Sequence, residues 1–142
     1  MKKVIIIIIA LILVIALGMV YYLNFSKEKQ VEQNNSNSKN SYKSISQEEA
    51  KKIMDTQTNI VILDVRTEEE YKEGHIKNAM LIPVDEIANR AESELKDKEQ
   101  EILVYCRSGN RSKKASQILA DKGYTNIKEF GGIKDWKYEV VK

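Results

Sequence analysis

Short apolar runs alternate with helical segments from residue 42 to the end of this 142-residue chain, and this alternation limits the possible folds more than any other feature. Ile60–Leu63 and Ile102–Tyr105 are wholly apolar and rich in β-branched residues. Such runs are typical of strands that are buried on both faces of a sheet. Strands that alternate with helices predict a parallel sheet with helices packed on both faces, which is an α/β fold.

The other elements are predicted from caps, breakers and periodicity. A capping box at Ser46–Glu49 begins a helix that runs to about Met54. Apolar residues at helical spacing predict a second helix over about 85–95. We also expect strands at 42–45, 80–82 and 126–130, helical turns at 68–72 and around Trp136, and a helix over 112–122 that ends at Gly123.

The first 23 residues predict a membrane anchor or an export signal. Val4–Leu23 is a run of 20 apolar residues, which as a helix would span about 30 Å of hydrocarbon. We favour an uncleaved anchor, because the apolar region of a cleaved signal peptide is usually about 7–15 residues long. Lys2 and Lys3 favour an inside N-terminus, although two lysines after the span weaken this bias. We therefore expect a membrane-anchored protein whose domain, residues 42–142, lies outside the cytoplasm after a flexible Asn- and Ser-rich linker at 24–41.

The charges and the cysteine count exclude several classes of function. Residues 1–42 hold five of the 23 basic residues and two of the 21 acidic ones, which leaves 18 basic and 19 acidic residues in the domain. A domain with this balance lacks the excess of basic residues that nucleic-acid binding requires. One histidine and one cysteine cannot form a Cys/His zinc site or an internal disulfide, so we expect no metal and no cofactor.

Cys106, the single cysteine, is the strongest candidate for chemistry. It follows the predicted strand Ile102–Tyr105 and begins the segment CRSGNRS (106–112), which leads into a predicted helix. At such a place backbone N–H groups converge and the helix dipole favours negative charge, so the thiol should ionise easily and act as a nucleophile. Asp64 and Arg66 follow another strand, and the carboxyl ends of parallel strands meet at one edge of the sheet.

Three motifs in order resemble those of the rhodanese-like family. They are LDVR (63–66) with EY (70–71), GHIKNA (74–79) and IP (82–83), then CRSGNRS (106–112), and finally Gly131-Gly132 with Trp136. The resemblance covers about 42–141. It implies a three-layer domain with a five-stranded parallel sheet and helices on both faces.

The resemblance also implies a sulfurtransferase. The Cys106 thiolate would take a sulfane sulfur from a small anionic donor such as thiosulfate and pass it, as a persulfide, to an acceptor. That acceptor would be cyanide, a thiol or a thioredoxin-like protein. The resemblance assigns donor binding to the rest of the loop, with Asp64 and Arg66 in support: the loop residues are Arg107, Ser108, Gly109, Asn110, Arg111 and Ser112.

The residues leave other readings open. A persulfide carrier or a redox-sensing binding module needs the same loop as an enzyme. Cysteine-dependent phosphatases and arsenate reductases resemble C-x5-R, whereas Cys106 and Arg111 are spaced as C-x4-R. Cys106 could also be a small buried hydrophobe. Asp64 and His75 are expected to have structural roles.

Overall fold

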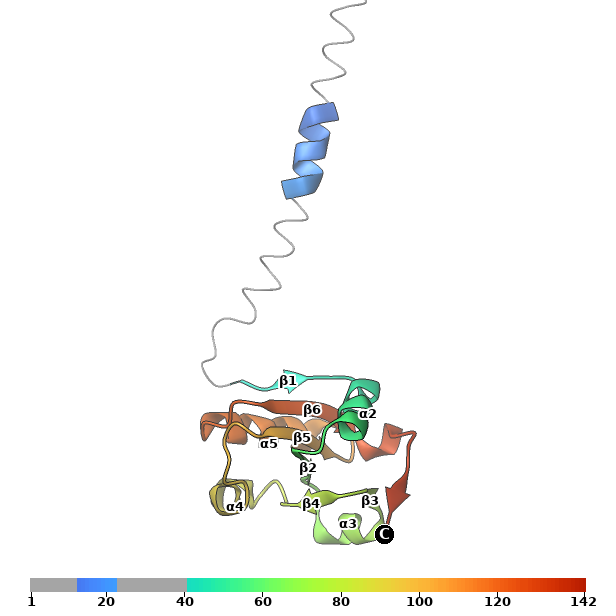
Figure 1. Cartoon of the computed structure of the whole chain (residues 1–142), viewed down its shortest axis with the longest axis vertical. Coiled ribbons are helices and arrows are strands. Elements are labelled where there is room, and N and C mark those ends of the chain that lie inside the picture. The colour runs from blue at the N-terminus through green and yellow to red at the C-terminus, as the bar shows by residue number, and fades with distance from the viewer. Residues whose placement is uncertain (1–12, 23–40) are drawn as a thin grey trace, which may run out of the picture. The chain divides into compact units, whose positions relative to one another are not determined.

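The computed structural model describes residues 13–22 and 41–142. Residues 13–22 form a helix, and 41–142 form an α/β domain (Figure 1). In these described parts of the chain, no helix is long and apolar enough to cross a membrane. The predicted anchor at 1–23 and linker at 24–41 lie mostly outside the described residues, and both remain predictions.

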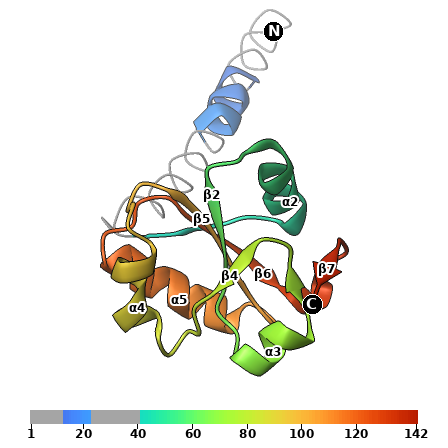
Figure 2. The same cartoon turned by 60° about the horizontal axis from the view of Figure 1, so that its bottom comes forward.

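The domain is built on a parallel sheet, as predicted. Its strand order is β1-β6-β5-β2-β4, and each neighbouring pair is parallel (Figure 1). Figure 2 shows β2, β4, β5 and β6 from another direction. The strands are β1 (Lys43–Ser44), β2 (Ile60–Asp64), β4 (Ala79–Leu81), β5 (Glu101–Cys106) and β6 (Ile127–Gly132). Because β5 lies in the middle, its carboxyl end at Cys106 is flanked by the ends of two other strands.

Helices cover both faces of this sheet. The helices are α2 (Gln47–Thr56), α3 (Glu68–Glu73), α4 (Ile87–Glu94) and α5 (Asn110–Asp121), followed by the 3-10 helix η1 (Ile133–Asp135). Side chains of β5 alternate between the two layers. Ile102 and Val104 pack in the cluster that includes α4 and α5, whereas Leu103 and Tyr105 pack in the cluster that includes α2. By this alternation Cys106 belongs to the α5 side.

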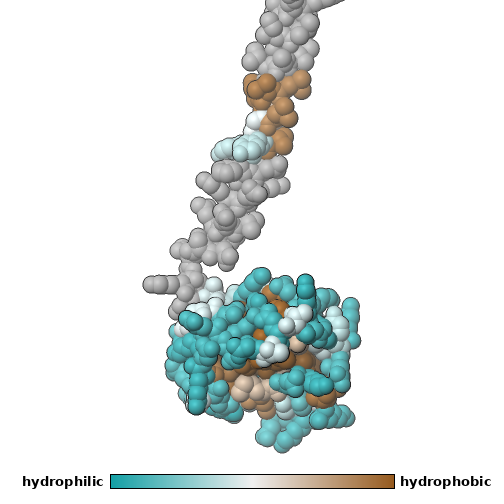
Figure 3. Space-filling model, in the orientation of Figure 1, coloured by the Kyte–Doolittle hydropathy of each residue, from teal (hydrophilic) through white to brown (hydrophobic). Residues whose placement is uncertain are grey.

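The surface of the domain is mostly hydrophilic, with an apolar area across the middle of the face shown in Figure 3. The described helix 13–22 differs, because its apolar side chains are exposed; Leu17, for example, is 70 % exposed.

Two helix starts differ from the prediction. Ser46 does cap α2 by accepting the N–H of Glu49 at 3.1 Å, but the Glu49 carboxylate lies 3.7 Å from Lys43 Nζ. A reciprocal capping box occurs at α3 instead, where Thr67 and Glu70 each accept the other's backbone N–H. The helix after the cysteine begins at Asn110 rather than at residue 112, because Gly109 adopts a left-handed conformation and ends the loop early.

The C-terminal region also differs. Trp136 is the C-cap of η1 rather than the centre of a helix. An antiparallel pair, β3 (His75–Ile76) with β7 (Val140–Val141), was not predicted. The two segments are far apart in the sequence, so only the tertiary fold brings them together.

Candidate active site

The sulfur of Cys106 lies within a tight loop at the carboxyl end of β5. The backbone N–H of Gly109 donates a hydrogen bond to Sγ at 3.0 Å, and Ser112 Oγ lies 3.5 Å from Sγ. Cys106 is 1 % exposed. The sulfur is therefore enclosed by donors of its own loop and of the first turn of α5.

These donors lower the pKa of the thiol. Burial raises the pKa of Cys106, but hydrogen bonds outweigh burial and bring it below the ordinary value. The donors are the Ser112 hydroxyl and the backbone N–H groups of Ser112, Gly109 and Ser108. A hydrogen bond that stabilises the anion favours the thiolate, which is the nucleophilic form.

The two glycines after β6 form the other side of the loop. A register shift places Val104 opposite Glu129 but Cys106 opposite Gly132, so β6 carries one additional residue there. A Cβ atom on Gly132 would lie 2.1 Å from the carbonyl oxygen of Arg107, so only glycine fits. The same carbonyl accepts the N–H of Lys134 at 3.2 Å. The loop thus rests on the β6–η1 connection.

Arg111 is held by Glu70, which lies in the helical turn predicted at 68–72 and was not a predicted site residue. Both oxygens of Glu70 accept hydrogen bonds from the Arg111 guanidinium, at 2.6 and 2.8 Å. These bonds lower the pKa of Glu70 to about 2. The remaining predicted loop residues, Arg107, Ser108 and Asn110, are exposed. Arg107 is therefore the loop cation that faces solvent.

Asp64 and Arg66 lie at the same sheet edge, as expected, but they contact each other and the scaffold. The Asp64 carboxylate accepts hydrogen bonds from the Arg66 guanidinium and, at 2.7 Å, from the Tyr105 hydroxyl. Tyr105 in turn accepts the N–H of Ile76 at 3.1 Å, and Arg66 donates to the carbonyl of Gly74 at 2.7 Å. This buried network ties the segment after β2 to the strand that ends in Cys106.

The sequence analysis missed Glu129. Its side chain is buried, with 3 % exposure, and Oε1 lies 2.6 Å from Ser112 Oγ, the hydroxyl beside the cysteine. Oε1 also accepts the N–H of Gly131 at 2.9 Å. Strand alternation offered a signal, because residue 129 lies on the same face of β6 as the buried Ile127.

Among residues 13–22 and 41–142, no group of three or more His, Cys, Asp or Glu side chains is placed to hold a metal ion. At the cysteine loop, the structure shows one sulfur surrounded by hydrogen-bond donors.

A comparison with known protein families identifies the family of the domain. The sequence profile described as "Rhodanese-like domain" matches residues 46–139. The chain belongs to the rhodanese-like family. The matched range contains the Cys106 loop, the Asp64–Arg66 pair and the two glycines that support the loop.

Relatives of the rhodanese-like domain are named for sulfur transfer. The chain is 38 % identical to the thiosulfate sulfurtransferase PspE of Escherichia coli K12 over 80 residues, which cover 56 % of this chain and 77 % of PspE. It is 37 % identical to the thiosulfate sulfurtransferase GlpE of Coxiella burnetii over 97 residues, covering 68 % of this chain and 88 % of GlpE.

Solved structures agree with the family. A crystal structure of a rhodanese-like domain protein from Staphylococcus aureus superposes with a TM-score of 0.61 at 35 % identity, covering 68 % of this chain and 93 % of that one.

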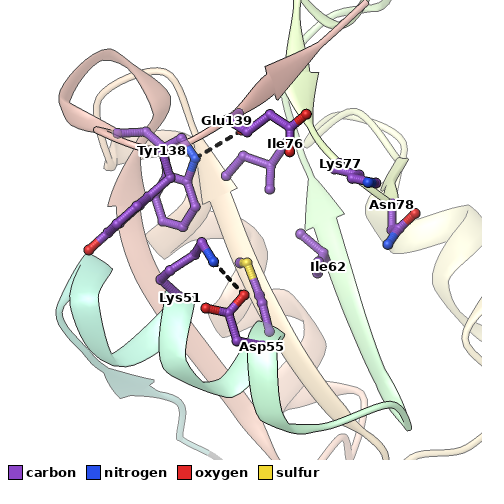
Figure 4. Close-up of a pocket in the computed structure, with 10 residues that line it drawn as sticks. Lys51, Asp55, Ile62, Ile76, Lys77, Asn78, Tyr138 and Glu139 are labelled. Atoms are coloured by element: carbon purple, nitrogen blue, oxygen red, sulfur yellow. Dashed lines mark hydrogen bonds and ion pairs between the residues drawn. The ribbon is translucent and has the colours of Figure 1, made fainter.

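The rhodanese-like domain also carries a pocket away from the cysteine. The pocket has a volume of about 230 Å³ and lies beside α2 (Figure 4). Ile62 and Ile76 line it together with Lys51 and Asp55, which form an ion pair. Cys106 and the rest of its loop do not line this pocket, so it is separate from the candidate active site.

Proposed function

We propose that this domain is a sulfurtransferase in which Cys106 carries the transferred sulfur as a persulfide. One observation carries the proposal: Cys106 Sγ accepts the N–H of Gly109 at 3.0 Å inside a loop whose donors lower the pKa of the thiol. This environment favours the thiolate form of the sulfur. The names of the two relatives support thiosulfate as a donor of the right class.

The proposed reaction has two half-reactions. In the first, a lone pair of the Cys106 thiolate attacks the sulfane sulfur of thiosulfate. The sulfur–sulfur bond of the donor breaks, and sulfite leaves with the bonding pair. In the second, cyanide or a thiolate attacks the outer sulfur of the persulfide, and the Cys106 thiolate leaves with its electron pair. A covalent intermediate between two half-reactions predicts ping-pong kinetics.

The loop residues have distinct parts in this proposal. The backbone N–H groups that surround Sγ would also stabilise the negative charge of the outer persulfide sulfur. The exposed Arg107 would attract the anionic donor. Because Cys106 is 1 % exposed, the donor would reach the sulfur past the exposed part of the loop, Arg107 and Ser108.

Two rival functions are distinguishable from this one. A phosphatase or arsenate reductase requires an arginine that clamps an oxyanion. Here both Glu70 oxygens already engage the Arg111 guanidinium, which disfavours that rival. A persulfide carrier uses the same loop, but it would transfer sulfur only to a partner protein such as a thioredoxin-like one.

Replacement of the nucleophile tests the proposal. Cys106→Ser should abolish thiocyanate formation from thiosulfate and cyanide, because an alkoxide does not form under conditions where a thiolate does. Intact-mass measurement should show one reducible extra sulfur atom on the wild-type protein after thiosulfate treatment and none on the variant. Far-ultraviolet circular dichroism should be the same for both.

The outcomes separate the alternatives. Residual turnover in Cys106→Ser would contradict the assignment. A wild-type protein that gains the sulfur but shows no turnover with cyanide or small thiols would be a carrier.

We also propose that the N-terminal segment anchors the domain to a membrane, with the domain outside the cytoplasm. The exposed apolar side chains of helix 13–22 support this, because apolar area in water is unfavourable by about 25 cal/mol per Å².

A further inference from the structure

The cysteine loop carries two arginines that differ in their partners. Arg107 is exposed, and within the described residues its side chain forms no ion pair. The guanidinium of Arg111 instead donates hydrogen bonds to both oxygens of Glu70, at 2.6 and 2.8 Å. An anionic donor at the loop therefore meets one unbalanced cation, Arg107, and one pair whose net charge is zero.

The pair of Arg111 and Glu70 lies beside the sulfur. Arg111 is the second residue of α5, and the next residue, Ser112, has its Oγ 3.5 Å from Cys106 Sγ. The pKa of Arg111 is raised mainly by its hydrogen bonds to Glu70, and the charge of Cys106 raises it further. Only groups that lie close together affect each other in this way. A donor bound at the sulfur is thus within range of the net charge of the pair.

The acid of this pair is fixed in place and ionised. Oε2 of Glu70 accepts the backbone N–H of Thr67 at 3.1 Å, and Thr67 Oγ1 accepts the N–H of Glu70 at 3.3 Å. The hydrogen bonds from Arg111 lower the pKa of Glu70 to about 2. At neutral pH the charge of Arg111 is therefore balanced by a carboxylate that the start of α3 holds in position.

Two other acids near the loop are buried, and a donor does not contact them. Asp64 pairs with Arg66, and their side chains are 0 % and 6 % exposed. Glu129 is 3 % exposed and lies against the Ser112 hydroxyl. Glu70 differs from both, because 22 % of its side chain and 32 % of the Arg111 side chain are exposed.

The charge of the donor makes this balance important. Thiosulfate carries two negative charges. A thiosulfonate, in which a carbon group replaces one oxygen, carries one, and it presents the same terminal sulfane sulfur. The attraction between a cation and an anion grows with the charge of the anion. An unbalanced second arginine would therefore favour the dianion, and a balanced one removes that advantage.

We propose that Glu70 is a specificity-determining residue that, by neutralising Arg111, weakens the preference of the cysteine loop for dianionic donors and admits donors with a single negative charge. The inference rests on the proposed sulfur transfer. Glu70 is a positioning residue in this scheme, because it acts on the donor through Arg111. The donor class that it adds to thiosulfate is that of singly charged sulfane-sulfur compounds, such as thiosulfonates and the persulfides of small thiols.

Steady-state kinetics of the full-length protein with thiosulfate and methanethiosulfonate test the proposal, with cyanide as the acceptor. In both reactions the Cys106 thiolate attacks the sulfane sulfur and the sulfur–sulfur bond of the donor breaks. Sulfite leaves with the bonding pair in one case and methanesulfinate in the other. The measured quantity is the kcat/KM for thiosulfate divided by that for methanethiosulfonate. Because both donors react with the same thiolate, a change in its nucleophilicity cancels in this ratio.

Three variants change the charge of the pair. Glu70→Gln leaves Arg111 unbalanced, so the ratio should rise about fivefold, mainly through a lower KM for thiosulfate; this is the effect of one unit charge on another about 4 Å away in water. Arg111→Gln leaves Glu70 unbalanced and should lower the ratio by a similar factor. The double variant Glu70→Gln/Arg111→Gln is neutral again, and its ratio should return to that of the wild type.

Glu68→Gln is the matched control. It removes one negative charge from the same helix, but residues two apart on a helix do not share a face, so the ratio should stay unchanged. The effect of Glu70→Gln should also decrease when salt is added, because salt screens partly exposed charges. An unchanged ratio in Glu70→Gln, or a double variant that keeps the ratio of either single variant, would overturn the proposal. If Glu70→Gln does not fold, an unchanged ratio in Arg111→Gln overturns it.

Failure of the proposed function gives a different result. A wild-type protein that transfers sulfur from neither donor would refute the proposed function, and this inference with it. An active wild type whose ratio does not respond to the charge of the pair would refute this inference alone.

Discussion

Gly132 shows how one residue can determine whether the cysteine loop closes. Its φ of −129° suits any residue, so its backbone conformation does not require glycine. The space does, because a Cβ would meet the backbone of Arg107 at 2.1 Å and of Ser108 at 2.6 Å. Gly109 presents the reverse case: the nearest atom to a Cβ there is 3.6 Å away, but φ is +104°.

Replacing each of these glycines by alanine should separate the cost of a steric clash at Gly132 from the cost of backbone strain at Gly109. Gly132→Ala should lower the free energy of unfolding by about 3 kcal/mol, because main-chain atoms must move. Gly109→Ala, the matched control, should cost about 1–2 kcal/mol from backbone strain alone. Urea denaturation measures both, and a Gly132→Ala variant as stable as the wild type would contradict the close approach.

At the scale of elements, one ion pair connects α3 to α5 beside the cysteine loop. Glu70 accepts the Arg111 guanidinium through both oxygens and also completes the capping box of α3 with Thr67. The Glu70 side chain therefore caps α3 and also positions the first turn of α5, the helix that follows the cysteine loop. The first turn of α5 is thereby held from outside as well as by Gly109.

The lowered pKa of Glu70 predicts a pH-dependent contribution to stability. Its pKa falls from 4.5 to about 2 in the folded protein, so the folded state binds the proton less tightly than the unfolded chain. The pair therefore stabilises the fold fully above pH 4.5, and this contribution is lost as the pH falls towards 2.

Glu70→Gln tests this contribution. Near neutral pH the variant should be less stable by about 1 kcal/mol, because the pair is partly exposed. The difference from the wild type should shrink as the pH falls, in urea denaturation repeated across this range. Glu68→Gln is the control, since its pair with Lys72 is mostly exposed and should contribute little at any pH. A constant difference between wild type and Glu70→Gln would argue against the ion pair.

At the scale of the whole molecule, the parallel sheet gathers residues that lie far apart in the sequence. The ends of β2, β5 and β6 bring the Asp64 network, the cysteine and the supporting glycines to one edge. The proposed role of the N-terminal region is attachment to a membrane.

Membrane attachment can be measured on the full-length chain. We expect it to sediment with membranes and to resist carbonate extraction, because the run Val4–Leu23 is long enough to span a bilayer as a helix. Leu13→Lys should make the protein more easily extracted, since a charge at the middle of a span costs about 3 kcal/mol. A shortened form released without membranes would show that the segment is cleaved.

Local sequence patterns were sufficient for the main elements of the domain. The apolar runs at β2 and β5 predicted buried strands, and their alternation with helices predicted the parallel sheet that the structure confirms. Cys106 was placed at a strand end for the same reason. Local patterns did not predict strands that pair with a segment far away in the sequence, as β3 does with β7.

The sequence alone determined the type of layers, the order of the main strands and helices, and the position of the single thiol, because periodicity, caps and breakers act between near neighbours in the chain. The contacts of Glu70 with Arg111 and of Glu129 on β6 with Ser112 on α5 depend instead on the three-dimensional fold. Glu70 and Arg111 are 41 residues apart, and Ser112 and Glu129 are 17 apart. No local pattern specifies such pairs, since the register of β6 against β5 and the packing of α5 on the sheet bring them together.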